Sequence, residues 1–184
     1  MDKQITILGF AGSLRKGSFN KALLRAALEL SPENVKLETF DLEGIPPYNQ
    51  DLDSDMPEKV REFKKKIRAA DAILIATPEY NYSIPGVLKN AIDWASRPPG
   101  DNAFDGKPVA IMSASVAMLA GSRAQYHLRQ SFVYLNMFPV NRPEVMVPQA
   151  QDKVDANGNV TDEKTRQKIK ELLESLAAWT IKLK

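Results

Sequence analysis

The sequence of 184 residues contains no cysteine and only one histidine, His127. Without thiols, the chain forms no disulfides and offers neither a thiolate nucleophile nor cysteine ligands for zinc or iron-sulfur centres. A single imidazole argues against a histidine-rich metal site, and a Ser-His-Asp triad would have to use His127. We therefore expect no metal site, and we expect any redox chemistry to reside in a bound cofactor.

The chain also lacks long apolar runs and strong charge. Apolar residues make up 43% of the sequence but are dispersed, and no run approaches the roughly 20 residues of a membrane-spanning helix. The net charge of +2 is too small to indicate nucleic-acid binding, although it suits an anionic ligand. The N-terminus lacks the zones of a secretory signal. These features predict one cytoplasmic domain over residues 1–184, with no membrane or nucleic-acid partner.

Short apolar runs rich in branched residues recur along the chain, as in strands buried on both faces. The runs are Ile5 to Phe10, Val35 to Leu42, Ala72 to Thr77, Val109 to Met112 and Val145 to Val147. Segments with helical periodicity lie between them, as at Val60, Phe63, Ile67 and Ala70. This alternation predicts an α/β fold, a five-stranded parallel sheet with helices on both faces and right-handed crossovers. The arrangement that we expect for it is a doubly wound sheet of order 2-1-3-4-5.

A loop between the first apolar run and the first helical segment carries glycine, hydroxyl, amide and arginine groups. A loop that leaves a buried strand and enters a helix presents unpaired N–H groups, and the helix dipole adds positive potential. The candidate phosphate ligands are Ser13, Arg15, Ser18 and Asn20. The alternative is structural: Ser18 caps the helix while Arg15 and Lys16 are solvated.

Two better-known phosphate motifs do not fit this loop. Gly12 and Gly17 have the spacing of a P-loop, but Ser18 stands where lysine is required, which argues against ATP hydrolysis. Together with Gly9, the same glycines lack the spacing of a dinucleotide fingerprint. A phosphomonoester such as FMN fits the remaining donors.

A second polar loop follows the third apolar run, from Thr77 to Gly86. In a sheet of order 2-1-3-4-5, the carboxyl ends of the first and third strands lie side by side where such folds bind ligands. The two loops should therefore face one cavity. Backbone groups of the second loop could meet the polar edge of a flat heterocycle, with Tyr80 and Tyr82 as aromatic walls. Pro85 is better explained as the start of a helix.

Three sequence blocks, from Gly12 to Asn20, from Thr77 to Trp94 and from Gly121 to Arg129, cover much of the chain in fixed order. In these blocks the sequence resembles the NADPH-dependent FMN reductase family, and within it the chromate and quinone reductases. The resemblance implies a flavodoxin-like fold with one FMN per subunit. It also implies electron transfer from NADPH or NADH to quinones, free flavins, azo dyes or chromate.

The resemblance further implies roles for particular residues. Those at the FMN phosphate would be Ser13, Arg15, Ser18 and Asn20, with Phe19 as a further cofactor-binding residue. Those at the isoalloxazine ring would be Pro78, Glu79, Tyr80, Asn81 and Tyr82, with Ser115 at its far edge. Near Ser115 the chain departs from the family, because Ala117 and Ala120 stand at positions that are often glycine. Their methyl groups disfavour a left-handed backbone there.

The family commonly forms dimers or tetramers with the active site at a subunit boundary. The stretch 132–138 is apolar nearly all round, which indicates either a partner surface or a fully buried helix. On the family's pattern, the candidate interface contacts are Arg123, Tyr126 and Glu144. His127 is predicted to be structural, and the basic run from Lys64 to Arg68 to be a solvated helix face.

We therefore predict an FMN-dependent oxidoreductase in which NADPH or NADH delivers hydride to FMN and a small-molecule acceptor then takes the electrons. Sharing of one flavin face gives ping-pong kinetics, and no side chain is expected to be catalytic because the cofactor carries the chemistry. The alternative is a flavodoxin-type electron carrier without NADPH activity, which the slightly basic chain disfavours. A third possibility is a relative that has lost FMN.

Overall fold

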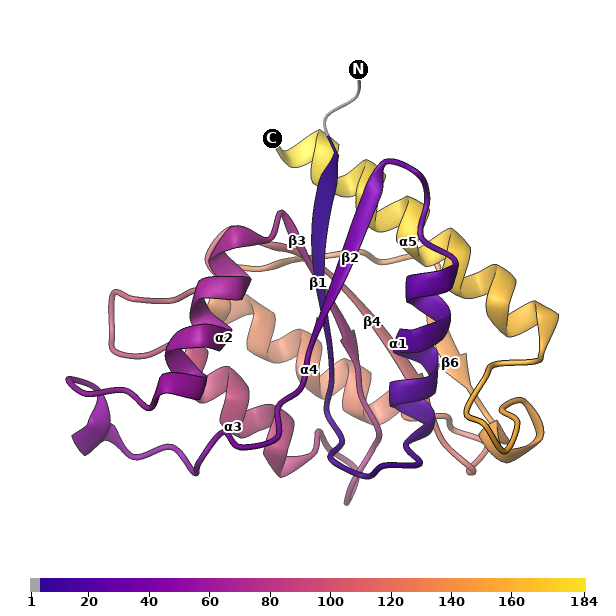
Figure 1. The fold of residues 1–184 in the computed structure, drawn as a ribbon, viewed down its shortest axis with the longest axis horizontal. Helices are drawn as coiled ribbons and strands as arrows, with labels where there is room; N and C mark the ends of the chain where they lie inside the picture. Colours follow the sequence, from indigo (N-terminus) through magenta and orange to yellow (C-terminus); the bar gives the residue numbers. More distant parts are fainter. Residues whose placement is uncertain (1–3) are drawn as a thin grey trace.

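The computed structural model describes residues 4–184, and Figure 1 shows a twisted parallel sheet with helices on both faces. The strands are β1 (Ile5–Ala11), β2 (Val35–Phe40), β3 (Ala72–Ala76), β4 (Pro108–Ala114), β5 (Phe138–Pro139) and β6 (Val145–Val147). The helices are α1 (Phe19–Glu29), α2 (Glu58–Ala69), α3 (Gly86–Ala95), α4 (Ser122–Leu135) and α5 (Glu163–Leu183). Two 3-10 turns, η1 (Gln50–Leu52) and η2 (Ala150–Asp152), lie in the connections.

The strands lie in the order β2-β1-β3-β4-β5, all in parallel, so the predicted order 2-1-3-4-5 is confirmed. The fifth position differs from the prediction because two short strands share it. β5 pairs with Pro108 and Val109, whereas β6 pairs with residues 112–114 of β4. Pro139 and Pro143 fall in this stretch, and proline has no N–H to donate to a continuous ladder.

Burial along the strands follows their place in the sheet. All residues of β3 and β4 are buried, as expected for central parallel strands covered on both faces, whereas the edge strand β2 alternates buried with more exposed positions. One apolar core packs α1 and α5 on one face, and a second packs α2, α3 and α4 on the other. No helix within residues 4–184 is long and apolar enough to cross a membrane.

The basic run in α2 differs from its predicted role at one position. Lys64 is only 2% exposed, and its Nζ donates to the Asp101 carboxylate at 2.7 Å and to the Asp101 carbonyl at 3.1 Å. It also bonds the carbonyl of Arg97. The prediction of a solvated face was therefore wrong for Lys64, because a loop more than thirty residues away covers it. Lys65 and Arg68 are exposed as expected.

The last helix, α5, begins at a side-chain cap. Asp162 Oδ2 accepts hydrogen bonds from the Thr165 hydroxyl at 2.7 Å and from the Thr165 N–H at 2.8 Å. These two bonds lower the pKa of the Asp162 carboxyl. A helix cap that is ionised in the folded protein also interacts favourably with the positive end of the helix dipole.

We expect Asp162→Ala to lower the free energy of unfolding by about 1 kcal/mol at pH 7, because the cap is lost. The carboxyl's pKa is lower in the folded than in the unfolded chain, so this stabilisation is present above the unfolded pKa and disappears as pH falls through the folded one. Urea unfolding of parent and variant from pH 7 downward measures both effects. Asp162→Asn keeps a capping oxygen and is the matched control; equal losses in both variants would contradict the capping role.

Candidate functional site

Three connecting loops leave the carboxyl ends of adjacent strands: residues 12–18 after β1, 77–85 after β3 and 115–121 after β4. They lie along one edge of the sheet, at the bottom of the view in Figure 1. The ladder extends into the loops, because Gly12 N donates to Ala76 O at 2.8 Å and Thr77 N donates to Met112 O at 3.0 Å. The first two loops therefore start side by side, at the position where doubly wound sheets bind ligands.

The first loop, 12–18, presents hydroxyl groups and the start of α1. Ser18 is the N-cap of α1, and its Oγ accepts from Lys21 N at 3.4 Å. Ser13 Oγ accepts from Arg15 N at the same distance, and both serines are buried. Ser18 therefore caps α1, as the structural alternative for this loop predicted. This role does not exclude anion binding, since each hydroxyl still has its own O–H to donate.

Asn20 is bound in a way that the sequence did not indicate. Its side chain is 2% exposed, donates from Nδ2 to Ala114 O at 3.0 Å and accepts from Ala114 N at 3.0 Å. The amide therefore ties the first turn of α1 to the carboxyl end of β4, 94 residues away. No local pattern reveals this partner, because the two segments meet only through the sheet order.

The second loop contains a tight, two-residue turn. Tyr80 and Ser83 exchange two backbone hydrogen bonds of 2.9 Å, and the residues between them, Asn81 and Tyr82, have φ angles of +50° and +65°. Positive φ at both central positions is the conformation of a type I′ turn, which normally favours asparagine and glycine. Tyr80 and Tyr82 are 52% and 65% exposed, so both rings stand at the surface of the site.

The Glu79 side chain contacts the start of α4. Its Oε2 accepts from the N–H groups of Arg123 at 3.0 Å and Ala124 at 3.3 Å, and its Oε1 accepts from Arg123 Nη1 at 2.8 Å. The Arg123 guanidinium also lies over the Tyr82 ring, 3.7 Å from its centroid. On the same side, His127 Nδ1 lies 3.1 Å from Ser83 Oγ. The loop is therefore attached to one helix at three places.

The backbone of the third loop, 115–121, differs from the prediction that alanine would disfavour a left-handed conformation there. Ala120 has a φ of +52° despite its methyl group, and Gly121 follows at +83°. The carbonyl of Ala120 accepts from the buried Ser113 hydroxyl at 2.5 Å, so a tertiary contact holds the conformation that the methyl group disfavours. Ser115 Oγ accepts from Ala117 N at 3.1 Å. The loop also exposes the apolar side chains of Val116, Met118 and Leu119. Sequence reasoning missed them because a loop has no periodicity that would indicate exposed apolar positions.

The helix face predicted as a partner surface or as fully buried is amphipathic. Phe132 and Leu135 are buried, whereas Val133 and Tyr134 are 84% and 74% exposed, so the fully buried alternative is wrong. Of the three predicted interface residues, Tyr126 donates to Glu144 Oε1 at 3.2 Å, and Arg123 binds Glu79 as described above. The partner surface itself stays a prediction.

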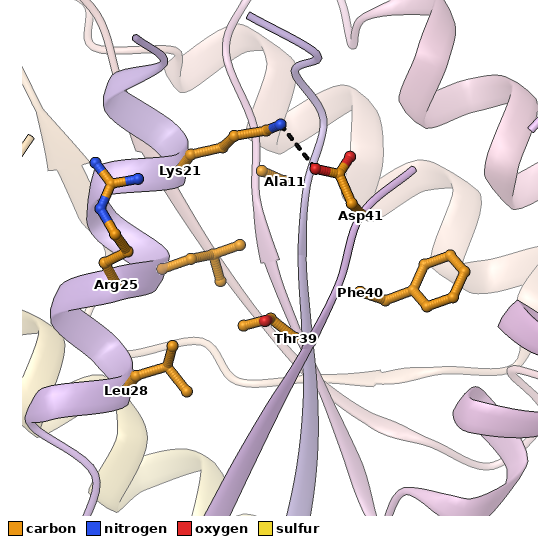
Figure 2. Close-up of a pocket in the computed structure, with 8 residues that line it drawn as sticks. Ala11, Lys21, Arg25, Leu28, Thr39, Phe40 and Asp41 are labelled. Atoms are coloured by element: carbon orange, nitrogen blue, oxygen red, sulfur yellow. Dashed lines mark hydrogen bonds and ion pairs between the residues drawn. The ribbon is translucent and has the colours of Figure 1, made fainter. Parts of the chain in front are cut away.

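Two cavities lie beside α1. One of about 170 Å³ lies between α1 and the edge strand β2, where Figure 2 shows the ion pair of Lys21 Nζ with Asp41 Oδ2, at 2.9 Å, near one end. Partial burial raises the pKa of Asp41, but hydrogen bonds from the Glu43 N–H and Lys21 outweigh it and leave the pKa lowered. The second, about 460 Å³, lies between residues 16–19 and 154–158.

The described part of the chain contains no group of three or more His, Asp or Glu side chains that could hold a metal ion.

Sheet order and loop placement define the flavodoxin-like class of α/β proteins. The sequence model for NADPH-dependent FMN reductases matches residues 5–152, and the chain belongs to that family. It is 50% identical to the NAD(P)H-dependent FMN reductase of Pseudomonas aeruginosa over 185 residues, which cover 100% of each chain. It is 47% identical to the 2-hydroxy-1,4-benzoquinone reductase of a Burkholderia species over 91% of this chain and 92% of the relative.

A solved structure gives the same result for the fold. The flavoenzyme NAD(P)H:(acceptor) oxidoreductase FerB of Paracoccus denitrificans superposes with a TM-score of 0.88 at 36% identity, covering 97% of this chain and 98% of FerB. The predictions of the family, of a flavodoxin-like fold and of an enzyme that uses FMN with NAD(P)H are thereby confirmed.

Proposed function

We propose that this enzyme transfers hydride from NADPH or NADH through bound FMN to quinones, with free flavins, azo dyes and chromate as further acceptors. The observation that carries the proposal is the placement of loop 12–18 beside loop 77–85 at the switch point of the sheet. FMN needs a phosphate site and a ring site within its own length, and we propose that these two adjacent strand ends provide them. The quinone reductase among the relatives supports the choice of acceptor.

The first loop fits a phosphate group. The first turn of α1 carries no acidic side chain, the N–H groups of Phe19 and Asn20 have no carbonyl partner one turn earlier in the helix, and the buried hydroxyls of Ser13 and Ser18 stand at its start. We propose that Arg15 and the backbone around Phe19 complete the site. Because the Asn20 amide is bonded to Ala114, we propose that Asn20 contributes through its backbone N–H.

The second and third loops suit a flat ring. We propose that backbone groups of residues 78–82 meet its polar edge, with Tyr80, Tyr82 and Ser115 nearby. When bound, FMN supplies hydride acceptance and electron delivery. The protein orients the ring and offers N–H donors where negative charge develops. The side chains of Tyr80, Tyr82 and Met118 are exposed, and we propose that they contact flat acceptors.

We propose that residues 1–184 form one domain, and that the enzyme works in the cytoplasm as a homodimer or homotetramer. Support for an oligomer comes from α4, where Val133 and Tyr134 present an exposed apolar and aromatic surface. Sedimentation of the purified enzyme, in parent and Val133→Asp forms, distinguishes an oligomer that uses this surface from a monomer.

The function is tested by the visible spectrum of the purified protein during anaerobic addition of NADPH. We expect a flavin spectrum that bleaches on addition of NADPH and returns when a benzoquinone is added. A flavin spectrum that NADPH leaves oxidised would favour the flavodoxin-type carrier. A colourless protein that FMN does not reconstitute would overturn the proposal. Repeating the reoxidation with chromate, an azo dye and free FMN ranks the acceptors.

A further inference from the structure

Helix α4 starts without a cap from its own segment. Its N-cap residue is Gly121, which has φ +83° and provides no side-chain hydrogen bond. The N–H groups at the start of a helix need partners, and here a carboxylate from a distant loop provides them. Glu79 Oε2 accepts from Arg123 N and Ala124 N, although Glu79 lies 44 residues before Arg123 in the chain. A carboxylate at this end of a helix also interacts favourably with the helix dipole.

The Arg123 side chain binds the second oxygen of the same carboxylate. Its guanidinium pairs with Glu79 Oε1 at 2.8 Å and lies over the Tyr82 ring, with its central carbon 3.7 Å from the ring centroid. The Glu79 side chain is 13% exposed and that of Arg123 is 34% exposed, so water competes only partly for this pair. A guanidinium over an aromatic face adds a cation–π attraction.

The turn that these contacts hold is unfavourable by itself. Asn81 and Tyr82 both have φ in the left-handed region, which costs a non-glycine residue on the order of 1–2 kcal/mol, and asparagine tolerates it better than tyrosine does. The same pair of hydrogen bonds between Tyr80 and Ser83 also closes type II′ turns, so these bonds do not by themselves require positive φ at both central residues.

We propose that Glu79 is a positioning residue that holds loop 77–85 in its strained turn by capping α4, and that Arg123 restrains Tyr82 in the same turn. This inference rests on the proposed function for the identity of the ring. It assigns the Glu79 carboxylate a role as hydrogen-bond acceptor for the protein, not as an acid or base for the substrate. The charge of Glu79 is therefore less important than the one oxygen, Oε2, that accepts from both α4 N–H groups.

Glu79→Gln and Glu79→Ala distinguish these roles. Glutamine keeps an oxygen that accepts from the α4 N–H groups, whereas alanine keeps none. We expect Glu79→Ala to lose roughly 10-fold to 100-fold in kcat as the ring is misplaced, and Glu79→Gln to lose several-fold less than Glu79→Ala because one acceptor remains. We also expect a shifted visible spectrum of bound FMN in Glu79→Ala alone. Equal loss of kcat in both variants, or an altered pH profile in Glu79→Gln, would overturn the proposal in favour of an acid–base role.

Hydrogen exchange on the FMN-free protein tests the hold on the loop without any flavin. In the parent we expect protection of the Tyr80, Ser83, Arg123 and Ala124 amides, and in Glu79→Ala we expect that protection to fall together. Glu174→Gln, on the exposed side of α5, is the control for removal of a surface carboxylate and should change none of these amides. If Ser83 keeps its protection in Glu79→Ala, the proposal fails even where the enzyme proves to be an FMN oxidoreductase. If the parent binds no FMN, this measurement still decides whether Glu79 holds the turn.

Discussion

Asn20→Ala is expected to lower the free energy of unfolding by about 2–6 kcal/mol and to weaken FMN binding. The substitution leaves the N–H and the carbonyl of Ala114 buried without their partner, and each unsatisfied buried group costs about 1–3 kcal/mol. The loss should also release α1 from β4, so that loop 12–18 is no longer fixed relative to the strand ends. Urea unfolding and FMN titration of the apoprotein measure the two effects.

Asn20→Asp is the matched control for size. Aspartate retains an acceptor for the Ala114 N–H but places a carboxylate oxygen against the Ala114 carbonyl, where the amide donated at 3.0 Å. We expect its destabilisation to be comparable to that of Asn20→Ala, because the negative carboxylate oxygen would face the partial negative charge of the buried carbonyl oxygen. Were either variant to unfold like the parent, the buried bridge would not be the link between α1 and β4.

Gly121→Ala is expected to destabilise the protein by about 2–4 kcal/mol and to disturb the third loop. A methyl group there would sit 2.8 Å from Ser113 Cβ and 3.0 Å from Ser113 Oγ, and φ is +83°. Ser113 is fully buried in β4 and cannot move aside. Thermal unfolding measures the loss, and FMN affinity reports the displacement of Ser115 and its neighbours.

The neighbouring residue provides the control. Ala120 also has positive φ, but its methyl group is already accommodated, so Ala120→Gly relieves strain while it removes a small buried group and adds freedom to the unfolded chain. We expect stability within about 1 kcal/mol of the parent. A loss in Ala120→Gly as large as that in Gly121→Ala would show that any change in this loop is disruptive and that the contact with Ser113 is not the cause.

The strands were predictable from local patterns, and their order followed from the class of fold. Runs such as Ile5 to Phe10 and Ala72 to Thr77 are apolar without alternation because helices cover both faces of a central parallel strand, and this signal is contained in each run. The division of the fifth position was not predictable, since β5 has two residues and too little sequence to form a pattern. Short strands depend on their neighbour for hydrogen bonds and not on their own composition.

The burial of polar side chains was the least predictable property. Lys64 belongs to a run of charges that indicates a solvated face, yet Asp101 and the carbonyl of Arg97 cover it. Ala120 carries a methyl group that disfavours positive φ, yet the Ser113 hydroxyl holds it there. In both cases a partner distant in sequence or a buried neighbour outweighs the local preference.

By itself, the sequence determined the class of fold, the family and the two loops that face the proposed ligand, because periodicity, turn residues and motif spacing are local properties. Only the tertiary structure decided what Asn20 and Glu79 bind. Both residues stand inside the motifs that suggested ligand contacts, but their side chains satisfy N–H and carbonyl groups of β4 and α4 instead. Such partners are chosen by the order of the strands, which brings together segments that lie 44 and 94 residues apart.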